Sequence, residues 1–158
     1  MIVEYEAKYE DDVKDLLVEL QEYLAEIDKE KLNICTKEYR DKYFEDTMKI
    51  VTESQGKIFL ELDNEKAIGL CIGIINNEKE ERYDFIAPRR GRIKELVVSK
   101  NYRGKGYGKK LLEYTKEYLK SVGCEFILIA VLSYNENAKR LYEANGFHAR
   151  LEDMIEKV

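Results

Sequence analysis

The sequence predicts a single α/β domain, 1–158, built on a mixed sheet with its elements in the order β-α-α-β-β-β-α-β-α-β. Short apolar runs alternate with longer segments whose apolar residues recur every three or four positions, as on one face of a helix. One strand leads through a glycine-rich turn into a helix and then another strand, which is the pattern of a crossover between parallel neighbours. With 158 residues, 44% of them hydrophobic, the chain can bury a core of its own.

Two helices follow a short first strand at 2–5. Apolar residues at helical spacing predict a helix over 9–27. Thr36 is expected to be the N-cap of a second helix that ends near residue 52, because its hydroxyl can accept a hydrogen bond from the first turn. The apolar positions of this second helix include Tyr39, Tyr43, Met48 and Val51.

A hairpin and a further strand come next. Residues 57–62 and 67–75 read as strands, and the short polar turn between them favours a hairpin. Cys71 lies inside the second of these strands and is expected to be a buried, inert thiol. Residues 77–91 are polar and mixed in charge, so we expect a loop or a distorted hairpin there, followed by a strand at 93–98.

The last part of the chain contains the crossover and a short helix. A helix starts at the glycine-rich turn and stops at Gly123, a residue suited to the left-handed position after a helix. The apolar run 126–132 reads as a strand buried on both faces. Asn135 then caps a short helix that ends at a second glycine. We expect the extended segment 147–157 to close the domain.

Composition excludes several classes of function. The net charge of −5 argues against a general nucleic-acid binder, which needs a basic face, and mildly favours a cationic partner. Three cysteines without C-x-x-C spacing and a single histidine indicate neither a disulfide framework nor a metal site. No apolar run approaches the ~20 residues needed to span a bilayer, so we expect a soluble cytoplasmic protein without membrane contact.

The glycine-rich turn Arg103-Gly104-Lys105-Gly106-Tyr107-Gly108 is the clearest functional signal. Glycine allows positive φ and lets a ligand approach the backbone closely. The first turn of the following helix has N–H groups without internal partners and a partial positive charge, so it can bind an anion. Lys109 and Lys110 add to the positive charge at this helix start, where the dipole disfavours cations. A bound polyanion would relieve that repulsion.

The spacing within the turn selects among phosphate-binding loops. In a Walker A loop the two glycines lie one residue further apart and Ser or Thr stands where this chain has Lys110. A dinucleotide loop has a third glycine where this chain has Lys109. The pattern Arg-x-x-Gly-x-Gly, formed by Arg103, Gly106 and Gly108, instead resembles the pyrophosphate loop of the GNAT superfamily of N-acetyltransferases.

This resemblance implies that acetyl-CoA (coenzyme A) is the co-substrate. It also implies a bulge in the strand before the loop, which splays that strand from its parallel neighbour at the centre of a mostly antiparallel sheet. The pantetheine arm of the cofactor would enter this gap, and an N–H near Val98 would face the thioester oxygen. The cofactor-binding residues implied are Leu96, Val97, Val98, Arg103, Gly104, Lys105, Gly106, Tyr107, Gly108, Lys109 and Asn135.

A second motif lies on the short helix near the end of the chain. It resembles the N-x-x-A-x-x-L-Y-x-x-x-G-F segment of the same family. By this resemblance Tyr142 would lie beside the coenzyme sulfur and act as general acid, since a phenol near pKa 10 can protonate a thiolate whose parent pKa is about 8.5. Asn135 would contact the pantetheine or cap the helix. The matching residues are Asn135, Ala138, Leu141, Tyr142, Gly146 and Phe147.

A general base is needed because an alkylamine is largely protonated at neutral pH and an ammonium cannot attack. Glu95 is the first candidate, since it lies on the strand that leads to the glycine turn. Strand alternation places Glu95 on the same face as Ile93 and Val97, although a bulge would change that register. Some members of the family carry a glutamate on the following strand, where this chain has Ala130, so the assignment of the base stays open.

The resemblance favours an acyltransferase that moves an acetyl group to a primary amine by direct attack, in a ternary complex and without a covalent acyl-enzyme. The alternative is a catalytically silent module that binds coenzyme A for regulation. The resemblance implies a small-molecule or peptide amine as acceptor, and the first two helices would form one wall of its pocket. Glu81 and Asp84 are further candidates to bind a cationic acceptor or to act through a water. Homodimers are common in this fold.

Overall fold

The computed structural model describes residues 1–76 and 83–158, and its sheet has five strands in the order β1-β2-β3-β4-β5. Neighbouring strands are antiparallel except β4 and β5, which are parallel. The sheet is therefore mixed and mostly antiparallel, and the predicted fold class is confirmed. The strands are β1 (Ile2–Glu4), β2 (Lys57–Asp63), β3 (Lys66–Asn76), β4 (Arg90–Val98) and β5 (Phe126–Ile129).

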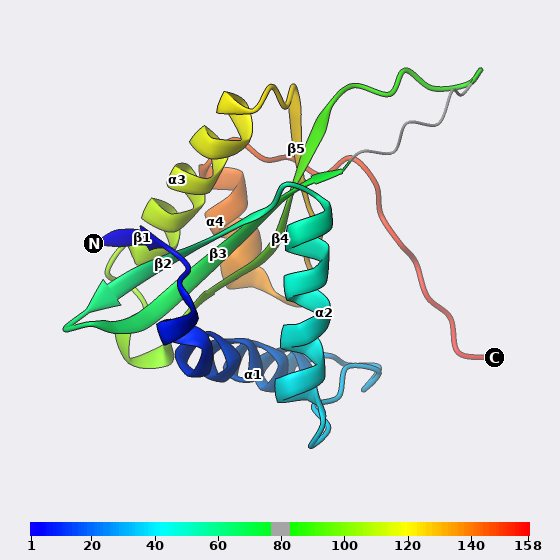
Figure 1. Cartoon of the computed structure of the whole chain (residues 1–158). Helices are drawn as coiled ribbons and strands as arrows, with labels where there is room; N and C mark the ends of the chain where they lie inside the picture. Colours follow the sequence, from blue (N-terminus) through cyan, green and yellow to red (C-terminus); the bar gives the residue numbers. More distant parts are fainter. Residues whose placement is uncertain (77–82) are drawn as a thin grey trace.

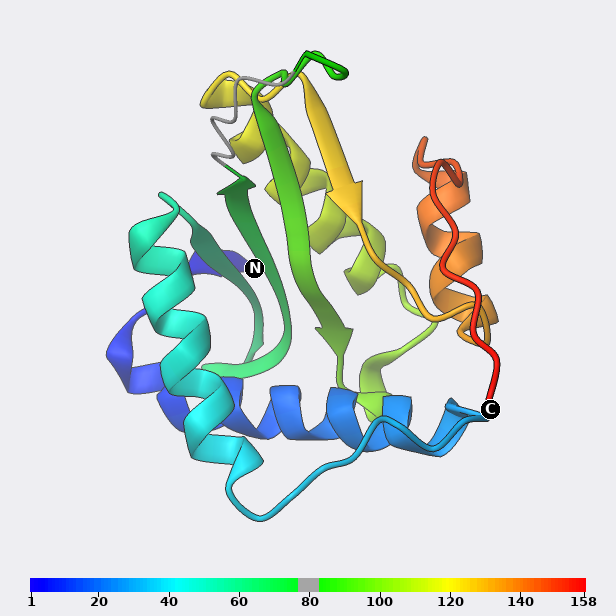
Figure 2. The same ribbon diagram turned by 90° about the vertical axis from the view of Figure 1, so that its right-hand side faces the viewer.

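Helices cover both faces of the sheet (Figures 1 and 2). Their buried residues place α1 and α2 against one face, and α3 and α4 against the other. In the ranges 1–76 and 83–158 no helix combines the length and the apolar character needed to cross a membrane. The helices are α1 (Glu10–Ile27), α2 (Tyr39–Glu53), α3 (Tyr107–Ser121) and α4 (Glu136–Ala144), with short 3₁₀ turns at Ala7–Tyr9 and Lys100–Tyr102.

The central strand β3 contributes to both halves of the core. Leu70 and Ile72 pack with α1 and α2, whereas Cys71 and Ile75 pack with α3, as the alternation of a strand requires. Cys71 is fully buried, and this burial raises the pKa of its thiol to about 12. The thiol is neutral at ordinary pH, so the prediction of a buried, inert Cys71 is confirmed.

A bulge in β4 shapes the region that follows it. Ile72 of β3 pairs with Glu95, but its neighbour Gly73 pairs with Ile93, so Lys94 is the extra residue on β4. β5 pairs with β4 over four residues only, the last being Ile93, and the two strands then diverge (Figure 2). The bulge and the splayed parallel pair implied by the resemblance are therefore both present.

Two predicted elements at the end of the chain differ in the structure. The strand predicted over 126–132 ends at Ile129, since the bulged β4 turns away and offers no partner beyond that point. The segment predicted to close the domain forms no strand, and residues 148–158 are exposed (Figure 1). Its apolar side chains, such as Leu151 and Met154, are 84% and 95% exposed and therefore contribute nothing to the core.

The start of α2 also differs from the prediction. Thr36 is not the N-cap, because the helix begins at Tyr39 after Glu38, and Glu38 makes no side-chain capping bond. Thr36 takes part only through its backbone oxygen, which accepts from the Tyr39 N–H at 3.2 Å. A backbone turn therefore replaces the expected side-chain cap.

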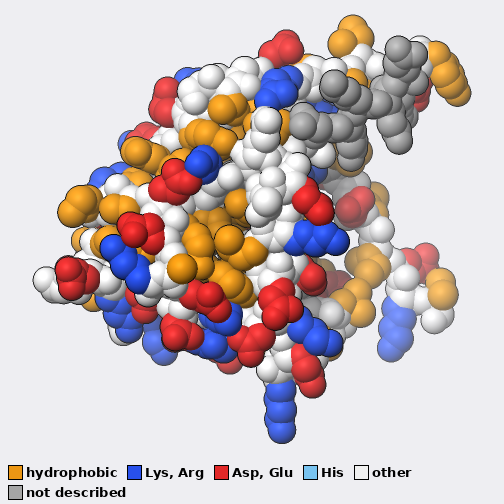
Figure 3. All heavy atoms as spheres, viewed as in Figure 1, with side chains coloured by type: hydrophobic (Ala, Val, Ile, Leu, Met, Phe, Trp, Pro, Cys, Tyr) orange, Lys and Arg blue, Asp and Glu red, His pale blue; other side chains and the backbone are white. Residues whose placement is uncertain are grey.

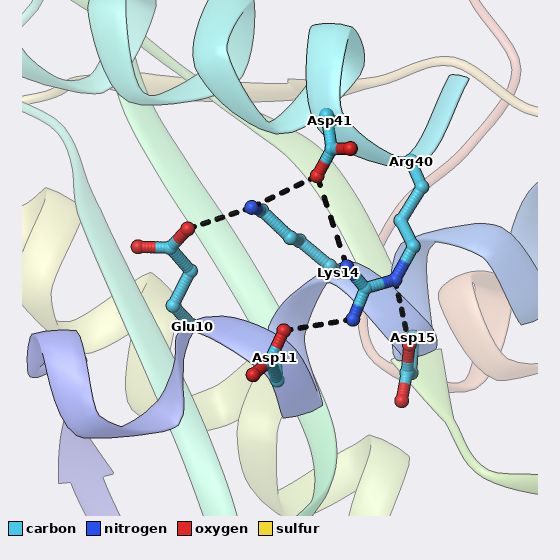
Figure 4. Close-up of polar contacts among 6 residues, drawn as sticks. All are labelled: Glu10, Asp11, Lys14, Asp15, Arg40 and Asp41. Atoms are coloured by element: carbon cyan, nitrogen blue, oxygen red, sulfur yellow. Dashed lines mark hydrogen bonds and ion pairs between the residues drawn. The ribbon is translucent and has the colours of Figure 1, made fainter. Parts of the chain in front are cut away.

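Ion pairs join α1 to α2 on the outside of this layer (Figure 4). Lys14 of α1 lies 3.0 Å from the carboxylate of Asp41 on α2. Arg40 of α2 reaches back to two carboxylates of α1, Asp11 and Asp15, each at 2.9 Å. These contacts fix how α2 lies across α1. The network consists of Glu10, Asp11, Lys14, Asp15, Arg40 and Asp41.

Arg40→Met is expected to lower the free energy of unfolding by about 1 kcal/mol, because exposed ion pairs contribute roughly 0.2–1 kcal/mol each. Urea denaturation measures the loss, which should shrink in 1 M salt as the charges are screened. Lys49→Met, at an exposed lysine of the same helix, is the control and should change stability little. An equal loss in both variants, or a loss that salt does not reduce, would contradict this role for Arg40.

The charges of this layer are mixed in sign. On the face seen in Figure 3, acidic and basic side chains are interspersed over α1 and α2 rather than gathered in a basic patch. Such a surface has no broad positive field on this side to attract a nucleic-acid backbone.

Candidate functional site

The glycine turn leads directly into α3. Gly104 and Gly106 have φ values of +76° and +85°, and Gly106 is the N-cap of the helix. No atom lies within 4 Å of a Cβ built on either glycine, so the backbone angle rather than lack of space requires glycine there. Residues 103–106 are exposed. The N–H groups of Tyr107, Gly108 and Lys109, which have no partner within the helix, therefore start a surface that can receive an anion.

Arg103 holds the turn against the rest of the domain. Its Nε donates to the Val98 oxygen at 2.9 Å, and its Nη2 contacts the Glu19 carboxylate of α1 at 3.2 Å. The guanidinium also lies 5.4 Å from the centre of the Tyr23 ring. Arg103 therefore has a positioning role in this structure, joining the end of β4, the glycine turn and α1.

Protein groups already neutralise some of the other cations. Lys110 lies 2.9 Å from the carboxylate of Glu61, a side chain only 2% exposed on β2. Burial acts to raise the pKa of Glu61, but the N-terminal ammonium of Met1 and Lys110 outweigh it, so the pKa is lowered and the group is ionised. Within the ranges 1–76 and 83–158, the ion pair of Lys109 is an exposed one with Glu113 at 3.7 Å.

Lys105 lies with its ammonium 5.3 Å from the centre of the Tyr102 ring, on the exposed side of the turn. Of the four cations that the sequence places here, Arg103 and Lys110 pair with carboxylates of other elements, Glu19 of α1 and Glu61 of β2, whereas Lys109 pairs with an exposed carboxylate of its own helix. Lys105 and Lys109 are thus the side chains best placed to meet a negatively charged ligand.

The end of β4 has backbone groups that face away from the sheet. The Ser99 N–H donates to the Ile68 oxygen of β3 at 2.9 Å. Alternation along the strand then directs the backbone groups of Val97 toward β3 and those of Leu96 and Val98 away from it, into the gap beside β5. The Val98 oxygen is taken by Arg103, which leaves the Val98 N–H in the gap.

Glu95 lies on the α2 side of the sheet, next to this gap. The bulge at Lys94 puts Glu95 on the same face as Val97 but moves Ile93 to the opposite face, so the expected alignment of Glu95 with Ile93 is wrong. The Glu95 carboxylate accepts a hydrogen bond from the Tyr43 hydroxyl. Burial raises its pKa, although this bond and the nearby Lys94 ammonium oppose the shift.

Tyr39 and Tyr43 were expected only as apolar positions of α2, yet both belong to the site. Their rings stack with centroids 4.6 Å apart and an interplanar angle of 14°. Lys94 donates to the Tyr43 hydroxyl at 2.8 Å. The one signal in the sequence is the spacing of four residues between the two tyrosines, which puts them on one face of a helix. The role of Lys94 has no sequence signal, because it depends on the bulge.

Tyr142 lies on α4 and packs into the α3 side of the core. Its ring is 6.0 Å from that of Phe147, in a T-shaped contact. Burial raises the pKa of its phenol, and the Glu95 carboxylate adds to this shift. The phenol therefore keeps its proton over the whole ordinary pH range. Tyr142 packs against the same buried cluster as Leu96 and Val98, which places its ring beside the end of β4.

Asn135 is buried and caps α4 as expected. Its Oδ1 accepts from the Ala138 N–H at 3.3 Å and from the Tyr23 hydroxyl at 3.4 Å. The side chain thus joins α4 to α1. Because both contacts use the amide oxygen, the NH₂ group is the part of Asn135 that could reach a ligand.

The other positions considered for the general base are exposed. Ala130 is exposed just after β5, and Asp84 is exposed in the loop before β4. Glu81 lies outside the described residues. Glu95 is thus the candidate carboxylate that lies on β4 itself, beside the splayed end of the strand.

Comparison with known proteins identifies the family that the two motifs resemble. A family model described as "Acetyltransferase (GNAT) family" matches residues 17–147. An uncharacterized N-acetyltransferase in the pepI 3′ region of Lactobacillus delbrueckii subsp. lactis is 28% identical over 97 residues, which are 61% of this chain and 54% of the relative. N-alpha-acetyltransferase 30 of Schizosaccharomyces pombe is 33% identical over 89 residues, 56% of this chain and 55% of the relative. The matches thus span about half the length of these two relatives.

Solved structures share the fold. The F44R mutant of the BH1408 protein from Bacillus halodurans aligns with a TM-score of 0.86 at 19% identity, covering 100% of this chain and 99% of the other. The aminoglycoside N-acetyltransferase AAC(6′)-Iy, solved in complex with CoA, aligns with a TM-score of 0.70 at 13% identity, covering 100% and 98%. At these identities the likeness concerns the fold alone.

Proposed function

The chain belongs to the GNAT acetyltransferase family, and from this premise we propose that it transfers an acetyl group from acetyl-CoA to a primary amine. The observation that supports this most is the convergence of four features on the splayed end of β4. They are the exposed glycine turn at the start of α3, the open backbone of Leu96 and Val98, the Glu95 carboxylate and the Tyr142 phenol. None of these features alone would support acetyl transfer.

The residues present fit coenzyme A. Gly104 and Gly106 leave open space above a helix start that can receive a pyrophosphate, with Lys105 and Lys109 beside it. The backbone of Leu96 and the N–H of Val98 offer hydrogen-bonding groups of the kind that an amide-containing arm can pair with. Acetyl-CoA bound in this way supplies a thioester whose carbonyl carbon accepts the amine nitrogen.

Three groups of this chain would then act on the reaction. Glu95 accepts the proton that the ammonium must lose before its nitrogen can attack, and burial makes this carboxyl more basic than an ordinary glutamate. The Val98 N–H donates to the carbonyl oxygen as negative charge develops there. Tyr142, which stays protonated, donates to the departing sulfur.

The cysteines favour direct attack in a ternary complex over a covalent acyl-enzyme. A cysteine nucleophile requires a thiolate, which forms readily only when the pKa is low. Burial is the first cause that raises the pKa of Cys35, Cys71 and Cys124. We therefore propose that the amine attacks the thioester without an acetylated protein intermediate, and that the protein works in the cytoplasm, where acetyl-CoA is available.

An acceptor screen tests this proposal. Purified protein with acetyl-CoA is mixed with aminoglycosides, polyamines, lysine and peptides with free N-termini, and the release of coenzyme A thiol is followed. We expect thiol release with at least one primary amine and an acetylated product of that amine by mass spectrometry. Binding of acetyl-CoA without thiol release for any amine would instead favour the silent regulatory module.

A further inference from the structure

Lys94 occupies an unusual place for a lysine. It is the extra residue of the β4 bulge, and its side chain is only 14% exposed on the α2 side of the sheet. Lysine is rarely buried to this extent unless its ammonium is paired. The ammonium of Lys94 must therefore have found partners that compensate for the loss of water.

Its partners form a site suited to a primary ammonium. The Lys94 Nζ lies 4.5 Å from the centre of the Tyr43 ring, 2.8 Å from the Tyr43 hydroxyl and 3.5 Å from the Glu95 carboxylate. An aromatic face, a hydroxyl oxygen and a carboxylate are all groups that bind an alkylammonium. Tyr39 stacks on Tyr43 and holds the ring in this orientation.

The Tyr43 hydroxyl connects these groups. It accepts a hydrogen bond from the Lys94 ammonium and donates one to the Glu95 carboxylate. An ammonium at this position is therefore linked, through one hydroxyl, to the carboxylate that can accept its proton.

We propose that the Tyr43 ring and hydroxyl, together with the Glu95 carboxylate, form the subsite for the primary ammonium of the acceptor, and that Lys94 occupies this subsite when no acceptor is bound. The acceptor is then an unhindered primary ammonium at the end of a flexible alkyl chain, chemically similar to the lysine side chain it displaces. The long side chain of Lys94 can swing toward solvent without moving the strand. The acetylation of the bound amine rests on the proposed function. Binding of the ammonium at the subsite does not depend on acetyl transfer.

Chemical rescue of Lys94→Ala by n-butylammonium chloride tests the proposal. This probe has a lysine-like alkyl chain and charge. We expect it to raise the melting temperature of Lys94→Ala in a saturable way and to bind that variant at least about tenfold more tightly than Lys49→Ala, which loses an exposed charge on α2. The uncharged n-butanol should not reproduce the effect. Equal effects on the two variants, or equal effects of the two probes, would overturn the proposal.

Acetylation of n-butylamine provides a second measurement, which also applies if Lys94→Ala does not fold. KM for n-butylamine should rise at least about threefold in Tyr43→Phe, because the ammonium loses the hydroxyl that accepts its hydrogen bond. The rise should stay modest because the aromatic ring remains and still attracts the ammonium. An unchanged KM in Tyr43→Phe would overturn the subsite. Rescue by n-butylammonium without any acetylation would leave the subsite standing and count against the proposed function, so the two can fail separately.

Discussion

Replacing Tyr142 by Phe is expected to lower kcat about a hundredfold while leaving the affinity for acetyl-CoA nearly unchanged. General acids contribute ~10²–10⁴ to rates, and the departing sulfur is left without its donor when the hydroxyl is removed. Among the described residues none forms a hydrogen bond with the Tyr142 hydroxyl, so its loss leaves no buried protein group unsatisfied. The variant should therefore fold as stably as the wild type.

Steady-state kinetics and acetyl-CoA titration of the same preparation separate these effects. Tyr114→Phe makes the same chemical change on α3, at a side chain that is 50% exposed, and should keep the wild-type rate. Full activity in Tyr142→Phe would show that the sulfur leaves without help from this phenol. A large loss of acetyl-CoA affinity would instead assign Tyr142 to binding.

Replacing Glu95 by Gln is expected to lower kcat/KM about a hundredfold or more near neutral pH and to change the pH profile. Glu95 must be ionised to accept a proton, and burial raises its pKa above the ordinary value of 4.5. The wild-type rate should therefore fall as the pH drops through this raised pKa, whereas the variant should lack that acid limb. The pH dependence of kcat/KM measures both.

The thermal stability of Glu95→Gln should not fall with its activity. Because the folded-state pKa is raised, ionisation of Glu95 costs the folded protein stability as the pH rises above about 4.5. The neutral amide avoids this cost and can still accept from the Tyr43 hydroxyl, so the variant should unfold at an equal or higher temperature at pH 7. Glu117→Gln, at an exposed residue of α3, is the control. Retained activity in Glu95→Gln would place the base elsewhere, with Asp84 the next candidate.

Local patterns explain what could be predicted from the sequence. The positive φ of Gly104 and Gly106, the left-handed Gly123 after α3 and the Asn135 cap each depend on a few adjacent residues. The same is true of the helical stripes and the hairpin turn. The position of the glycine turn between a strand and a helix could be read for this reason without any knowledge of tertiary contacts.

The details of the site depend on contacts between distant segments and could not be read in the same way. The bulge at Lys94 arises from the pairing of β4 with β3, and one extra residue reverses the face on which Ile93 lies relative to Glu95. The bond from Tyr43 to Glu95 joins residues 52 apart in the chain. Likewise, the number of cations near the glycine turn does not reveal that Lys110 pairs with the buried Glu61 on β2.

The most direct test of the account is a calorimetric titration of the purified protein with acetyl-CoA, with ADP as the comparison ligand. The account predicts saturable binding of one acetyl-CoA per chain and weaker binding of ADP, because ADP has the pyrophosphate but lacks the arm that pairs with Leu96 and Val98. Equal affinity for both ligands would indicate that the glycine turn binds phosphates in general and that the arm of acetyl-CoA contributes nothing to binding. The absence of any heat or thermal stabilisation with acetyl-CoA would contradict the account as a whole.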